Sequence, residues 1–169
     1  MASQEGAQLA QKIRQMVKEI ENLCAGLDEA AASRAPEDRW SPRMIISHLC
    51  GPEDAGLISA LQLILRQDTP QISLDAGNPH FSGKRSQMTL AELLAELKGR
   101  YERIADLVAG LSDGKLARKA HFPDLKETPL GEYLTLGAFV EALAGGHLDY
   151  HRNHLVEILQ ALGVSSSRK

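Results

Sequence analysis

The sequence predicts an all-α protein, a four-helix bundle with long connections between helices 2 and 3 and between helices 3 and 4. Apolar residues recur at three- and four-residue steps along most of the chain, which is the period of an amphipathic helix. Strict apolar–polar alternation, the pattern of a strand, is scarce. Four amphipathic segments with no strands between them are typical of a bundle in which each helix buries one apolar stripe.

Helices 1 and 2 have clear boundary signals. Helix 1 is expected over about residues 4–28, with Ser3 as its N-cap. Helix 2 begins at the motif WSPR, where Ser41 suits the N-cap and Pro42 the first helical position, because the missing N–H of proline costs nothing there. The ring of Pro52 crowds the preceding turn, so we expect helix 2 to kink or break before it resumes through LISALQLILR.

The second half of the chain continues the pattern after a long connection. Residues 68–88 are rich in Pro, Gly, Ser and Asn and are expected to form a loop, of a length that is often functional. Helix 3 opens at Thr89, and Glu92 completes a capping-box signature. A second irregular stretch leads to helix 4, expected over about residues 133–162 and ended by Gly163.

The length and composition of the chain indicate one soluble domain. The 169 residues carry a net charge of −3, so we expect a single domain over residues 1–164 and a disordered tail over residues 165–169. The sequence has no basic stripe that would bind the phosphate backbone of a nucleic acid. No apolar run reaches the roughly 20 residues that a membrane span needs, and the first residues lack the pattern of a secretory signal. We therefore expect a cytoplasmic protein that binds neither nucleic acid nor membrane. Cys24 and Cys50 form no CxxC motif, which indicates neither a disulfide framework nor a cysteine zinc site.

Three of the six histidines lie within eight residues of helix 4, in HLDYHRNH, residues 147–154. At 100° per residue His151 lies about 40° and His154 about −20° from His147, so all three share one narrow arc. The same arc holds the apolar residues Leu136, Val140, Leu143, Ile158 and Leu162. We therefore expect these histidines to point into the bundle, where His48 also lies on an apolar face of helix 2.

Buried imidazoles need a partner for each ring nitrogen, and one cation can satisfy several of them at once. The i, i+4 spacing of His147 and His151 lets both reach a common ion, and His48 would add a third nitrogen from the facing helix. Three protein ligands leave a position open for water or substrate, as in catalytic zinc sites. The alternative is that each is an ordinary core histidine, satisfied by a backbone carbonyl or a water.

Two motifs resemble the DinB/YfiT-like superfamily of four-helix-bundle metalloenzymes, and the resemblance spans nearly all of the chain. WSPRMIISHL resembles the family's Trp-Ser opening of helix 2, with a histidine eight residues after the tryptophan. GEYLTLGAFVEALAGGHLDYHRNH is similar to its final helix, which carries a His-x-x-x-His pair. On this match His48, His147 and His151 fall on the family's three metal-ligand positions. A second register would pair His154 with position 150, but Tyr150 breaks that pair, whereas the first register loses no ligand.

The resemblance implies a divalent cation, zinc before nickel or iron, in a cleft at one end of the bundle, and homodimers are frequent in the family. Assigned activities in the family include transfer of a low-molecular-weight thiol to an electrophile and thiol-dependent isomerisation. We therefore expect a metal-dependent thiol S-transferase or hydrolase that activates a thiol or water against a small-molecule substrate, with His154 as a catalytic group that orients a ligand or shuttles a proton. The alternative is a non-catalytic bundle that binds a small ligand or a metal at a degenerate site, because Pro52 follows His48 closely.

Overall fold

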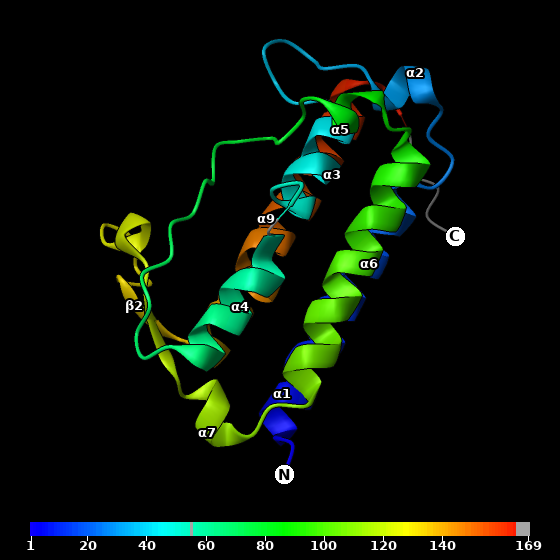
Figure 1. Ribbon diagram of the computed structural model, residues 1–169. Helices are drawn as coiled ribbons and strands as arrows, with labels where there is room; N and C mark the ends of the chain where they lie inside the picture. The colour runs from blue at the N-terminus through cyan, green and yellow to red at the C-terminus, as the bar shows by residue number, and fades with distance from the viewer. Residues whose placement is uncertain (55, 165–169) are drawn as a thin grey trace.

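A four-helix bundle forms the body of the protein in the computed structural model, which describes residues 1–54 and 56–164 (Figure 1). The predicted disordered tail, residues 165–169, lies outside the described residues. The bundle helices are α1 (Gln4–Cys24), α3 (Pro42–Cys50) followed by α4 (Gly56–Arg66), α6 (Leu90–Ala109), and a last helix made of α8 (Leu136–Glu141), the π-helical segment η2 (Ala142–His147) and α9 (Leu148–Ala161). The predicted all-α four-helix class is confirmed.

The bundle helices begin where the sequence supplies caps. Ser3, Ser41 and Thr89 each accept a backbone N–H on the side-chain oxygen at the starts of α1, α3 and α6, and Glu92 completes the capping box of α6. Such contacts satisfy N–H groups that have no partner within the helix, and each contributes about 1 kcal/mol. The predicted starts of these three helices are confirmed, whereas α1 ends at Cys24, four residues before the expected end of helix 1.

The break predicted at Pro52 is also confirmed, since residues 51–54 are not helical. Gly51 ends α3 with φ +74°, a backbone conformation that glycine adopts without steric cost. Two arginines, Arg85 and Arg100, donate to the carbonyl groups that this helix end leaves free. Those carbonyls belong to Ser47, Cys50, Gly51, Pro52 and Glu53.

The two long connections hold short elements that the periodicity did not predict. The first contains one helical turn, α5 (Lys84–Gln87), and the second contains α7 (Asp113–Leu116), the 3-10 turn η1 (Pro123–Leu125) and the antiparallel strands β1 (Lys119–His121) and β2 (Tyr133–Thr135). A further short helix, α2 (Glu29–Ala32), follows α1. Two expectations were therefore wrong: strands are present, and residues 133–135 form β2 rather than the start of helix 4. Three-residue strands are too short for an alternating pattern to be recognised, although their central residues Ala120 and Leu134 do face the core.

Packing between the bundle helices places α3 against the last helix. α1 packs most extensively against α6, and α3 contacts both α6 and α9 (Figure 1). Fully buried side chains fill the space between them, including Ile13, Ile20, Ile45, Ile46, Leu97, Val140 and Leu148. This packing fixes the ends of α3 and η2 relative to each other. Within the described part of the chain, no helix is both long enough and apolar enough to cross a bilayer.

Candidate metal centre

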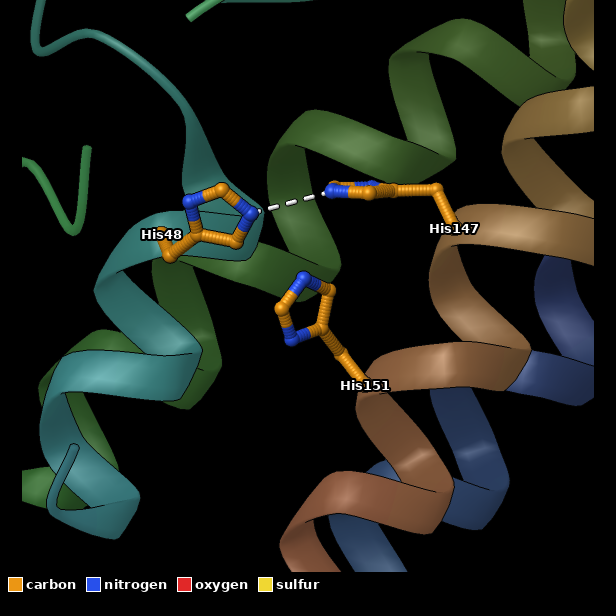
Figure 2. Close-up of side chains that lie close together, drawn as sticks. All are labelled: His48, His147 and His151. Atoms are coloured by element: carbon orange, nitrogen blue, oxygen red, sulfur yellow. Dashed lines mark hydrogen bonds between the residues drawn. The ribbon is translucent and has the colours of Figure 1, made fainter. Parts of the chain in front are cut away.

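Three histidines from the two facing helices converge on one point (Figure 2). His48 lies in the last turn of α3, His147 ends η2, and His151 lies in the first turn of α9. One ring nitrogen from each lies within 4.8 Å of the other two, and the Nε2 atoms of His48 and His147 are 3.0 Å apart. Figure 2 shows a ring nitrogen of His151 turned toward the space between the other two rings. The structure thus brings together the three residues that the sequence singled out as metal ligands.

The break after α3 does not move His48 away from this point. His48 Nδ1 lies 2.7 Å from the backbone carbonyl oxygen of Asn78. A carbonyl only accepts, so Nδ1 carries the proton and Nε2 presents its lone pair to the other histidines. A hydrogen bond of this kind on the outer nitrogen is usual for metal-ligating histidines, because it fixes the tautomer and the ring orientation.

His154, the predicted catalytic group, lies beside the three-histidine cluster rather than within it. Its Nδ1 is 3.5 Å from the Nδ1 of His151, and its ring is half-buried. Because His151 uses Nδ1 on this side, its Nε2 is the nitrogen that faces His48 and His147. Trp40 covers the same side, with its ring stacked on that of His151 at 6.1 Å between centroids and 5.0 Å from that of His48.

Burial keeps the three rings neutral at neutral pH. It lowers the pKa of His147 to about 4 and that of His151 to about 3, and neighbouring imidazoles add to the effect. Burial also lowers the pKa of His48, although the hydrogen bond to the Asn78 carbonyl opposes this effect. Neutral imidazole is the form that binds a metal ion. The Nδ1 atom of His147 is buried with no hydrogen-bond partner among the described residues.

The residues present fit a divalent cation. In a tetrahedral site, two nitrogens bound to one zinc ion at about 2.1 Å lie about 3.4 Å apart. The 3.0 Å between His48 and His147 is close to that spacing, and the widest pair, at most 4.8 Å apart, has to close by up to roughly 1.4 Å. Small changes in the χ angles of the three side chains supply such a movement at a cost of about 1 kcal/mol.

A cavity of about 510 Å³ opens beside His48 and His147. Its walls come from α4, the connection over residues 68–88 and the last bundle helix, and His80 from that connection also lines it. Sequence reasoning assigned nothing to His80 and missed Asn78. A histidine in a loop has no periodic context, and the Asn78 contact uses a backbone carbonyl, which any residue possesses.

The π-helical segment changes which residues of the last bundle helix line the cavity beside His147. Leu148 N–H donates to the carbonyl of Leu143, five residues back, so this turn holds one residue more than an α-helical turn. As a result Phe139 faces the cavity together with His147, whereas Val140, which the regular 100° step placed beside the histidines, is packed in the core. Val140 therefore faces the interior of the bundle, as the arc predicts, but it lies in the core and not in the cavity wall, because a helical wheel assumes a constant rotation per residue.

The fold and the site can be compared with known proteins. The structure of YfiT from Bacillus subtilis, described as a probable metal-dependent hydrolase with an unusual four-helix bundle topology, matches with a TM-score of 0.77 and 22% sequence identity, over 98% of this chain and 92% of that chain. This likeness shows a common fold. No curated protein matches the chain significantly. The family model of the DinB superfamily matches residues 12–155, and on this match the chain belongs to the DinB superfamily.

Proposed function

We propose that this protein is a metal-dependent enzyme in which His48, His147 and His151 bind one divalent cation. The observation that carries the proposal is the convergence of three neutral ring nitrogens at the edge of a cavity large enough for a small molecule. Zinc is the first candidate because it takes three histidines and leaves one position open, while nickel and iron also accept imidazole.

The reaction we propose is attack by water or by a thiol on a small-molecule substrate, giving hydrolysis or transfer. When bound, the cation would supply Lewis acidity, which lowers the pKa of water to about 7 and keeps a thiol as thiolate. The protein's own residues hold the site: the Asn78 carbonyl orients His48, and the Trp40 ring shields His151 from solvent on one side. We assign His154 a positioning role, because it contacts His151 Nδ1 and not the cavity.

Metal content tests the cation site directly. Protein made without a histidine tag is analysed by elemental mass spectrometry, beside a His147→Ala/His151→Ala variant and a His121→Ala control, whose ring stacks on Tyr133 away from the site. We expect about one equivalent of metal in the wild type and the control, and less than a tenth of that in the double variant. Equal, near-zero metal in all three proteins would refute the site.

Turnover separates an enzyme from the alternative, a bundle that binds metal or a ligand without catalysis. Metal-loaded protein is assayed against panels of hydrolysable substrates and of thiol–electrophile pairs. Activity that His48→Ala abolishes and His121→Ala retains supports the enzyme. Loaded protein that is inactive throughout favours the non-catalytic bundle. A homodimer and a cytoplasmic location stay predictions from the sequence.

A further inference from the structure

The cavity beside the three-histidine site is much larger than a cation and its water require. We propose that it binds an uncharged substrate with a hydrocarbon body, whose polar reactive group lies at His48 and His147. The reaction assigned to that group rests on the proposed function, whereas the preference for a hydrocarbon body does not. The volume of about 510 Å³ falls within the range of roughly 300–1,000 Å³ usual for small-molecule sites.

His48 and His147 lie at one end of this cavity. Phe139 precedes His147 by eight residues on the same helix and also lines the cavity, which places it roughly two helical turns from the histidine along the helix axis. On the opposite wall, α4 starts near the end of α3 and adds Leu57, Ala60 and Leu63 in order along its length. An extended hydrocarbon can therefore lie along both helices with one end at the ring nitrogens.

The charges around the cavity favour a neutral molecule. No Lys or Arg is among the described residues that line it, and the lining carboxylate, Asp75, is exposed and bonded to the Asn78 side chain at 2.9 Å. An anionic group in the apolar part would be buried without a partner, which costs far more than burying hydrocarbon gains. Each buried methylene, in contrast, raises affinity about fourfold.

Calorimetric titration with 1-alkanols, from butanol to decanol, tests the hydrocarbon preference on metal-free protein. We expect affinity to rise about fourfold per methylene until the chain fills the cavity, and octanoate to bind at least tenfold more weakly than octanol. Affinity that is independent of chain length, or octanoate that binds as well as octanol, would overturn the proposal.

Two phenylalanine variants on α4 show whether binding occurs in this cavity. Ala60 lines the cavity, whereas Gln62 is exposed on another face of the same helix. Ala60→Phe should lower octanol affinity at least tenfold, and Gln62→Phe should keep it within twofold. If Ala60→Phe fails to fold, Leu63→Ala supplies the test, because enlarging the cavity should move the preferred alkanol to a longer chain. Unchanged octanol binding in Ala60→Phe, or an unchanged preference in Leu63→Ala, would place the ligand elsewhere and refute the inference.

Comparison of 1-octanethiol with 1-octanol tests where the polar end lies. Zinc loading should strengthen octanethiol binding at least tenfold and leave octanol within a few fold, because only the thiol is a strong zinc ligand. No gain in protein that holds zinc would overturn the placement at His48 and His147. Chain-length-dependent alkanol binding by protein that takes up neither zinc, nickel nor iron would instead refute the proposed function and leave the hydrocarbon site standing, so the two failures are distinguishable.

Discussion

Arg85 ties the connection before α6 to the helix that carries His48, and its replacement by methionine should cost much of the protein's stability. The side chain is 1% exposed and donates to Glu96 at 2.9 Å, to the Ser47 carbonyl at 3.1 Å and to the Gly51 carbonyl. Arg85→Met keeps the length of the side chain but leaves a half-buried carboxylate and two carbonyls without this donor. Glu96 keeps its ion pair with Arg100 at 3.0 Å, but two buried carbonyl groups lose a charged donor, and each such loss costs about 1–3 kcal/mol. A loss of about 3 kcal/mol lowers the melting temperature of a chain of this size by about 10 °C.

Thermal unfolding followed by circular dichroism measures the loss, with Arg14→Met as the matched control. Arg14 also contacts two carboxylates, Glu102 and Asp106, but its side chain is 42% exposed, and such surface pairs contribute about 0–1 kcal/mol. Because Ser47 adjoins His48, Arg85→Met should also weaken zinc binding, by about tenfold. Equal melting temperatures for the two variants would refute the view that Arg85 anchors the end of α3.

Three further predictions concern stability. Tyr101→Phe should leave the free energy of unfolding unchanged or raise it by about 1 kcal/mol in urea denaturation, because its buried hydroxyl has no hydrogen-bond partner among the described residues. Thr89→Ala should lower the same quantity by about 1 kcal/mol through loss of the capping box, an outcome that an unchanged midpoint would contradict. Burial and neighbouring imidazoles hold the pKa of His147 at about 4 and that of His151 at about 3 in the folded protein, whereas both are about 6.5 in the unfolded chain. Between these pKa values the unfolded chain therefore binds more protons than the folded protein. Metal-free protein should therefore lose stability as pH falls from about 6.5 toward 4, and calorimetry should show a flatter dependence for His147→Gln/His151→Gln.

Local sequence signals predicted the helices well because they act over a few residues. Ser41 and Pro42 mark the start of α3, and Thr89 with Glu92 marks that of α6, since a cap is a contact between close neighbours in the chain. The strands β1 and β2 were missed for the opposite reason. Each is three residues long, and its pairing depends on a partner that the chain reaches only through a long connection.

The convergence of the three histidines was predictable, whereas their surroundings were not. The i, i+4 pair of His147 and His151 lies on one face in any α-helix, and the apolar context of His48 turned it inward. The contact of His48 with the Asn78 carbonyl depends on how a loop folds back, and the exposure of Phe139 to the cavity depends on a π turn. No local pattern specifies either feature.

Diffraction at a metal absorption edge shows whether His48, His147 and His151 bind one ion. Crystals of tag-free protein are grown without chelator, in the presence of zinc. We expect a single strong anomalous peak about 2.0–2.1 Å from one ring nitrogen of each of the three histidines. Absence of a peak there, with each ring nitrogen bonded only to backbone or water, would contradict it.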